Sequence, residues 1–266
     1  MTKKTLYSRP FKTTRAIAKY MLSGLTFTFA SFISYASPLW AQSAGNLNEL
    51  LSSGQANFTL PDFSDVGRPR RRIGGGSRGP CRVTNNLPLT ALAPYNSAGL
   101  TIAETPTFWF YVPYTLTPDH SVEFVLKDGN NEVYKTRFSG NETTPGIVNL
   151  HLPSTVSLEA EKDYNWYLLV YCDPQNQNRF VYVDGLVRRI QRPDIESQLE
   201  SATPQERIAL YATEGLWYDT LTHLAENLRA SPHNRRINQD WANLLRSVGL
   251  EPLASEPFVA CCSPEN

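Results

Sequence analysis

The chain is poor in the side chains from which metal centres and catalytic sites are usually built. It has 266 residues but only four cysteines and four histidines. No two cysteines show the two-residue spacing of a zinc ligand pair, and the histidines are scattered along the sequence. No sequence pattern identifies a nucleophilic side chain together with a general base. We therefore expect no metal and no cofactor, and the sequence assigns no catalytic residue.

Short matches to known motifs fall in one glycine-rich stretch and lack the structure that each motif needs. Gly74, Gly76 and Gly79 match the dinucleotide-binding pattern, which requires a strand before it and a helix after it. Residues 75–79 match the nucleophile elbow of α/β hydrolases, which requires a parallel sheet. A phosphate loop is excluded because Pro80 follows Gly79 where that loop has lysine. Whether the chain is an enzyme stays open, with the balance against it.

Long apolar runs are absent after position 41. The start of the chain is cationic up to Lys19, and a moderately apolar run, interrupted by serines and threonines, covers 20–40. This pattern is poor for a membrane span and typical of a secretory signal peptide. We expect removal of residues 1–41, with cleavage after Ala41 favoured over Ala36 and an uncleaved anchor as the alternative. The mature protein is then expected in the periplasm, the outer envelope or the medium, with no membrane span.

The four cysteines suggest one disulfide in an exported protein. Cys81 and Cys172 fall within the region that we expect to be folded, and an oxidising compartment permits a bond between them. Two buried thiols are the alternative. Cys261 and Cys262 are adjacent in a proline-flanked tail, and a bond between neighbours is strained. Thiols or a link to another chain are favoured for that pair.

The most distinctive stretch is residues 68–82, called here the arginine–glycine segment. It contains four glycines, two prolines and no acid. Its six arginines are Arg68, Arg70, Arg71, Arg72, Arg78 and Arg82. Glycine and proline disfavour helix and strand, and arginine is not buried without a partner. We expect an extended, solvent-facing cationic segment, and these arginines are the candidate anion-binding or partner-binding residues.

Charge divides the chain into regions of opposite sign. Residues 1–41 carry six basic residues and no acid, which leaves 19 basic and 25 acidic residues after position 41. Outside the arginine–glycine segment the remainder after residue 41 has a net charge of −12. The segment can therefore dock on its own acidic body, or on an acidic protein or an anionic envelope polymer. Export makes nucleic acid an unlikely partner.

Residues 81–191 predict a β-sandwich. Turn residues recur every 8–12 positions between stretches that alternate with a period of two. Expected strands are 107–112, 121–127, 132–138, 147–152, 164–171 and 180–189, with 164–171 central because it is the most apolar. Leu158 precedes Tyr164 by six residues, as in the tyrosine corner of immunoglobulin-like sandwiches. The fold class that we expect is mainly β with α: an antiparallel immunoglobulin-like sandwich followed by a small C-terminal helical region.

A mostly disordered linker is expected at 42–80, before the sandwich. The helical region is expected over 192–252, after the sandwich, and a tail at 253–266 follows it. Residues 203–206 (Thr-Pro-Gln-Glu) form a capping box with proline at the first helical position. Gly215 is expected to end or kink that helix. The stripe Trp217, Leu221, Leu224 and Leu228 predicts a second helix, and residues 241–248 mark a third.

Several separate stretches resemble a cyanobacterial family of exported proteins, the domain of unknown function 928. The similar residues are Gly67 to Cys81, Leu89 to Leu92, Pro106 to Pro113, Tyr164 to Cys172, Gly185 to Arg189, Gly215 to Asp219 and Leu244 to Leu250. The resemblance covers about residues 67–255. It implies export and a shared fold, and it supplies no activity, cofactor or site.

The sequence favours a non-enzymatic envelope protein that binds a partner through the arginine–glycine segment. Two alternatives remain at this point. One is a polysaccharide-acting envelope enzyme, and the other is a purely structural segment that docks on its own domain.

Overall fold

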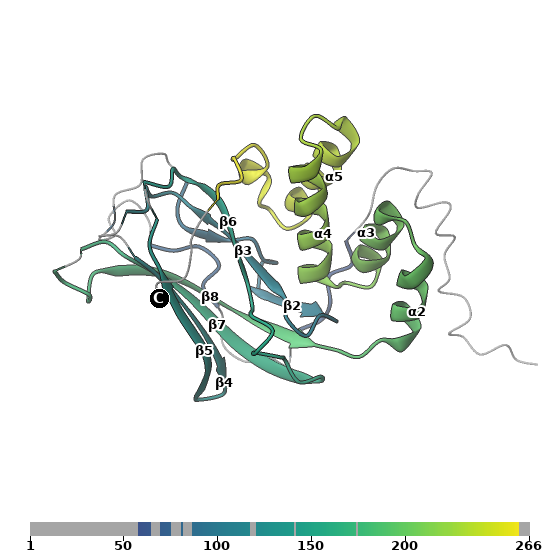
Figure 1. The fold of residues 1–266 in the computed structure, drawn as a ribbon, viewed down its shortest axis with the longest axis horizontal. Coiled ribbons are helices and arrows are strands. Elements are labelled where there is room, and N and C mark those ends of the chain that lie inside the picture. The colour runs from purple at the N-terminus through teal and green to yellow at the C-terminus, as the bar shows by residue number, and fades with distance from the viewer. Residues whose placement is uncertain are drawn as a thin grey trace, which may run out of the picture. The chain divides into compact units, whose positions relative to one another are not determined.

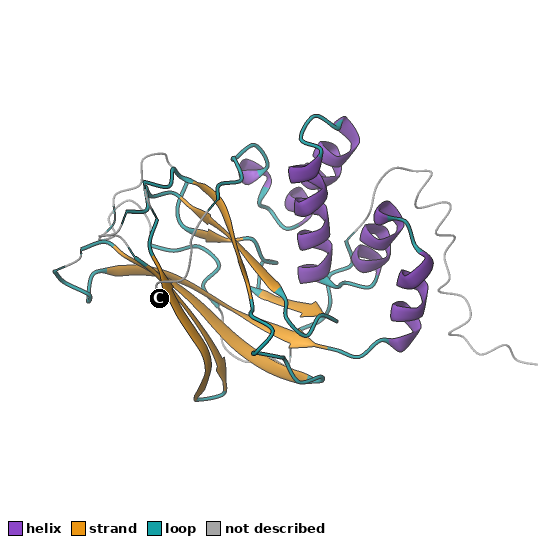
Figure 2. Cartoon of the chain, in the orientation of Figure 1, coloured by secondary structure: helices purple, strands orange, loops and turns teal. Residues whose placement is uncertain are grey.

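The computed structural model describes residues 58–64, 70–75, 81, 87–117, 121–140, 142–173 and 175–260. They form two sheets followed by four α-helices (Figure 1, Figure 2). The strands are β1 (Thr90–Ala91), β2 (Ala98–Thr101), β3 (Thr107–Val112), β4 (Val122–Asp128), β5 (Asn131–Phe138), β6 (Gly146–His151), β7 (Lys162–Tyr171) and β8 (Phe180–Arg189). Six of these eight strands match the predicted ones to within two residues at each end.

The strands are divided between a three-stranded and a five-stranded sheet. The smaller has the order β1-β3-β6, and the larger has the order β2-β8-β7-β4-β5. Strand β7 is central, as its apolar sequence predicts. The expectation of purely antiparallel pairing is wrong at one place, since β2 runs parallel to β8, with Ala98 opposite Leu186. Strand β2 is only four residues long and was not predicted.

Aromatic side chains fill the space between the sheets. Phe108 and Phe110 of β3 meet Trp166 of β7 with ring centroids 5.9 and 5.6 Å apart, and Phe108 lies 5.0 Å from Phe124 of β4. All four are at most 1% exposed. Burial of such large apolar surfaces is the main stabilising contribution to a domain of this kind.

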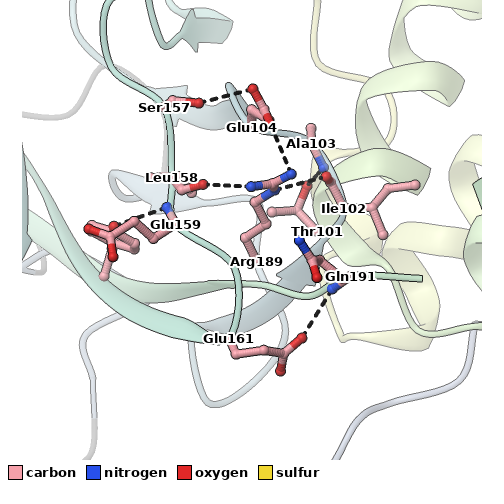
Figure 3. A network of polar contacts seen from close by, with 11 residues as sticks. Thr101, Ile102, Ala103, Glu104, Ser157, Leu158, Glu159, Glu161, Arg189 and Gln191 are labelled. Carbon is pink, nitrogen blue, oxygen red and sulfur yellow. Dashed lines mark hydrogen bonds and ion pairs between the residues drawn. The ribbon is translucent and has the colours of Figure 1, made fainter. Parts of the chain in front are cut away.

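A tyrosine corner leads into β7, as Leu158 and Tyr164 predict. The hydroxyl of Tyr164 accepts a hydrogen bond from the backbone N–H of Glu159 at 3.1 Å. Figure 3 shows the polar network beside it, where Arg189 donates to the carbonyl of Leu158 at 2.9 Å and to Glu104 at 3.0 Å. These bonds tie the corner to the end of β8 and to the segment that follows β2. The acids of the corner, including Glu161, thus serve the fold.

The helices are α2 (Pro193–Ser201), α3 (Pro204–Thr213), α4 (Trp217–Ala230) and α5 (Arg235–Ser247), followed by the short 3₁₀ helix η2 (Glu251–Leu253). Thr203 and Glu206 form the predicted capping box at the start of α3. Gly215 separates α3 from α4 with a φ of +70°, a conformation that side chains with a Cβ rarely adopt. The predicted apolar stripe of α4 is buried.

Two adjacent side chains at the start of α4 hold the helices against the sheets. The indole of Trp217 donates to the carbonyl of Leu92 at 2.9 Å. The Tyr218 hydroxyl donates to the carbonyl of Leu186 at 2.9 Å and accepts from the indole of Trp166 at 2.8 Å. Because these bonds are buried and join four elements, the helical region and the sandwich form one hydrogen-bonded unit.

Parts of the predicted linker and tail are packed against the domain. Phe58 contacts Trp217 edge-to-face at 4.9 Å, and Phe63 is 9% exposed. At the other end, the backbone of Pro257 and Val259 bonds to Ile147 of the edge strand β6. The expectation of a mostly disordered linker is therefore wrong for residues 58–64. Its two phenylalanines are anchored in the core, which hydrophobic periodicity does not register.

Candidate binding face

The arginine–glycine segment is fixed to the domain over Arg70–Gly75. Ile73 forms an antiparallel bridge with Thr90, and the N–H of Gly74 donates to the carbonyl of Leu89 at 2.7 Å. A side chain at Gly74 would meet Leu89 at 3.0 Å, so glycine permits this close approach. These residues are extended, as expected, but they are bonded to the domain, so the expectation of disorder is wrong for them. Arg68, Arg78 and Arg82 lie outside the described residues.

Arg71 is attached through its backbone and presents its guanidinium on the surface. Its N–H donates to a carboxylate oxygen of Asp184 at 3.0 Å, and its carbonyl accepts from the N–H of Asp184 at 2.9 Å. The guanidinium lies over the ring of Tyr182, 4.5 Å from its centroid. Arg70 next to it donates to the side chain of Asn165 on β7 at 3.3 Å. Both arginines therefore border the outer face of the five-stranded sheet.

Arg72 is turned in the other direction. Its guanidinium donates to the carbonyl of Val248 at 2.6 Å and to that of Ala93 at 3.4 Å, and lies 4.8 Å from the ring centroid of Tyr95. Burial lowers the pKa of this guanidinium. Arg72 thus joins the segment to the end of α5 and to the loop after β1. The structure separates neighbouring arginines that the sequence treats as equivalent.

A row of rings and cations crosses the outer face of the five-stranded sheet. Arg137 of β5 lies over Tyr171 of β7 at 4.8 Å. Tyr171 is 5.9 Å from Phe180 of β8, and Phe180 is 6.1 Å from Tyr182. Arg71 over Tyr182 completes it. We call these five residues the cation–aromatic row. The outward positions follow from the alternation of β7 and β8, in which the intervening valines are buried.

Two acidic groups beside the row are buried beneath its cations. Glu123 of β4 is 5% exposed and pairs with Lys135 at 3.2 Å and Arg137 at 2.9 Å. Although burial raises the pKa of Glu123, hydrogen bonds from Arg137 and Lys135 outweigh it, and the pKa is lowered. Asp184 is 6% exposed. These two carboxylates hold Arg137 and Arg71 in place.

The predicted disulfide is present and lies next to Tyr171 of the row. Cys81 is joined to Cys172, with Cα atoms 5.1 Å apart. Cys172 directly follows Tyr171, so the bond attaches the arginine–glycine segment at the end of β7. Cys261 and Cys262 lie outside the described residues.

Most of the row was missed by sequence reasoning. Outward aromatic residues on adjacent strands were the available signal, but the facing direction of each strand decides which rings are exposed. Trp109, Tyr111 and Tyr114, which also sit on or beside a strand, are at most 7% exposed. The described residues contain no group of three or more metal-ligating side chains. Nor does any helix among them have the length and apolar character needed to cross a membrane.

These features define a class: a two-sheet β domain with an attached helical region and an exposed cation–aromatic face. The chain belongs to the family described as Domain of Unknown Function (DUF928), whose model matches residues 73–258. The match spans both sheets and all four helices. A comparison with curated proteins finds no match.

Proposed function

We propose that this protein is an exported, non-enzymatic binding protein of the cell envelope, and that its ligand is an acidic polysaccharide. The observation that carries the proposal is the cation–aromatic row, in which Arg137, Tyr171, Phe180, Tyr182 and Arg71 follow one another across β5, β7 and β8.

The chemistry of the row fits a chain of charged sugars. Flat aromatic rings such as Phe180 and Tyr182 offer a rigid apolar surface to the C–H face of a pyranose. Guanidinium groups bind carboxylate and sulfate in a planar, two-bonded arrangement. The two cations lie at the ends of the row and the three rings lie between them. An extended polymer can therefore lie along the row without a deep pocket.

The composition of the face favours a polysaccharide over an acidic protein. A stable protein interface buries about 800 Å² per partner and has an apolar centre. Among the described residues of this face, the large hydrophobic side chains that are exposed are Phe180 at 37% and Val133 at 39%. A narrow row with so little exposed apolar area suits a polymer that supplies charge and ring faces.

Export supports an envelope ligand and excludes most contact with nucleic acid. The proposal rests here on the cationic start and the interrupted apolar run of residues 1–41. N-terminal sequencing of the protein from the envelope fraction is expected to begin between Ser37 and Gly45. An intact Met1 on a cytosolic pool would contradict export.

For the fold, we assign the sandwich to the immunoglobulin-like class. The assignment is supported by the strand orders β1-β3-β6 and β2-β8-β7-β4-β5 and by the tyrosine corner at Tyr164. In this arrangement the row lies on the outer face of the larger sheet.

Binding is tested with Phe180→Ala, Tyr182→Ala and Arg71→Gln, titrated with a polyuronate, a sulfated polysaccharide and a neutral glucan. Each variant is expected to weaken binding to the anionic polymers about tenfold, which corresponds to about 1.4 kcal/mol. Leu60→Ala and Arg229→Gln are matched controls, since both side chains are exposed and lie outside the row.

Three outcomes would count against the proposal. Unchanged affinity in all three variants would remove the row from the site. Equal binding of the neutral glucan would remove the role of charge, and capture of an acidic protein with no polysaccharide binding would change the ligand. Cleavage of an envelope glycan by the purified protein would instead favour the polysaccharide-acting enzyme.

A further inference from the structure

A polar groove lies between the helices and the sandwich, away from the cation–aromatic row. It consists of two adjoining cavities of about 290 Å³ and about 370 Å³, and His223 and Glu226 border both. The first is also lined by Thr107 and His151, on β3 and β6, and the second by residues of α3. Figure 1 shows α3 and α4 next to each other at this side of the sheets.

One face of α4 supplies the centre of the groove. Asp219, Thr222, His223 and Glu226 occur at i, i+3, i+4 and i+7, which places them on the same side of the helix. The ring of His223 stacks on Tyr211 of α3, with centroids 5.0 Å apart and an angle of 7° between the planes. The stack holds the His223 ring, which borders both cavities, as the flat floor of the groove.

Opposite charges stand on the two sides of that floor. Glu226 borders both cavities and supplies the negative charge, whereas Arg207 lines the cavity formed by α3. Burial lowers the pKa of His223. The charge of Glu226 raises this pKa and that of Arg207 lowers it, so both charges lie close to the ring. With the imidazole neutral, the groove offers one anionic and one cationic side.

Asp219 and Glu226 have different parts in this arrangement. The Asp219 side chain is 7% exposed and accepts from the backbone N–H of Ile102 at 3.3 Å, which fixes α4 to the segment after β2. Glu226 is exposed and not needed for that contact. Asp219, whose pKa is raised by burial, therefore serves the packing of α4, and Glu226 is the carboxylate that a ligand can reach.

We propose that this groove binds a small compound carrying both an ammonium and a carboxylate group, namely an amino acid or a short peptide. The ammonium group pairs with Glu226, the carboxylate pairs with Arg207, and the body of the ligand lies on the ring of His223. The combined volume of the two cavities accommodates a dipeptide. This site is independent of polysaccharide binding at the row.

The ligand class follows from charge complementarity. A purely anionic ligand meets the carboxylate of Glu226, and a purely cationic ligand has no partner for its charge at Arg207. A neutral sugar gains hydrogen bonds from the threonines but nothing from the separation of charges. Only a compound with both charges uses both sides of the groove.

Isothermal titration of the full-length chain with L-alanyl-L-alanine tests the proposal. N-acetylated and C-amidated forms of the same dipeptide and a neutral disaccharide are titrated beside it. The unmodified dipeptide is expected to bind, and blocking either end is expected to weaken binding about tenfold or more, because each removes one charge pair.

Variants separate the two charges from the fold. Glu226→Gln and Arg207→Gln are expected to weaken dipeptide binding about tenfold, because each removes one charge. Glu196→Gln and Arg229→Gln, which change exposed residues outside the groove, serve as matched controls and are expected to leave it unchanged. Since Glu226 is exposed, its variant is also expected to melt at the wild-type temperature. No heat with the dipeptide at millimolar concentration, equal binding of the blocked forms, or disaccharide binding alone would overturn the proposal.

Discussion

Replacing Arg72 and Arg71 by serine, one at a time, distinguishes a structural arginine from a surface one. The two residues are neighbours in sequence and equal in charge. Arg72 donates to the carbonyls of Val248 and Ala93, whereas the guanidinium of Arg71 lies over Tyr182 at the surface. Arg72→Ser is expected to destabilise the domain, and Arg71→Ser is expected to leave its stability nearly unchanged.

The expected magnitudes follow from the contacts. A hydrogen bond to a charged group contributes roughly 1.5–3 kcal/mol to stability. In Arg72→Ser the strong bond to Val248 is lost and the weaker one to Ala93 with it, while the cost of burying the guanidinium is recovered. A net loss of about 2–3 kcal/mol results. Arg71→Ser removes one exposed cation–π contact of roughly 0.5–1 kcal/mol, and its two backbone bonds to Asp184 remain.

The assay is thermal and urea unfolding of the two variants and the wild type under one set of conditions. For a domain of this size, 1 kcal/mol shifts the melting temperature by roughly 2–4 °C. Arg72→Ser should therefore melt about 4–12 °C below the wild type, and Arg71→Ser within about 4 °C of it. Equal melting temperatures for the two variants would refute the separation of roles, as would a larger loss in Arg71→Ser.

Three further predictions concern the fold. Replacing Cys81 and Cys172 together by serine should lower the free energy of unfolding by about 4 kcal/mol in the chain-entropy account of a loop of about 90 residues, and adding reductant to the variant should change nothing more in a urea titration. Burial raises the pKa of Asp219 to about 7, so the native state keeps a proton that the unfolded state loses near pH 4. The free energy of unfolding should therefore fall as the pH rises from about 4 to 7, by at most about 1.4 kcal/mol per pH unit. Asp219→Asn should remove this slope in urea titrations at pH 5, 6, 7 and 8. Tyr164→Phe loses the bond from the Glu159 N–H and should cost about 1 kcal/mol; an unchanged urea midpoint would show that the corner adds no stability.

Local patterns were enough to predict most of the elements. The alternation in 164–171 places every second side chain in the core, and the structure has this pattern. In β8 it holds only over 180–183, because residues 183–187 are all buried. The capping box at Thr203 sets the start of α3, and Gly215, with its left-handed φ, follows the end of that helix. Each of these signals acts within a few residues, so each can be recognised without knowing the fold.

What the sequence did not predict depends on contacts between distant segments. The parallel pairing of β2 with β8 joins residues almost 90 positions apart, and β2 is too short to carry a periodic signal. The attachment of Phe58 and Phe63 is of the same kind. His223 lies next to the apolar stripe of α4 in the sequence, and only the packing of α4 against α3 brings it onto Tyr211 and next to Arg207.

The candidate binding face combines both kinds of information. Composition identified arginine as the residue type to follow, and Arg71 is part of the row. The surface position of the Arg71 guanidinium, however, depends on Asp184, which accepts a hydrogen bond from the Arg71 backbone. Because Asp184 is buried, its carboxylate orients the arginine without presenting negative charge to solvent. Glu123, also buried, orients Arg137 at the other end of the row by pairing with its guanidinium. A count of charges along the sequence subtracts these two acids from the cations, whereas in the folded domain they are what keeps the cations exposed and in line.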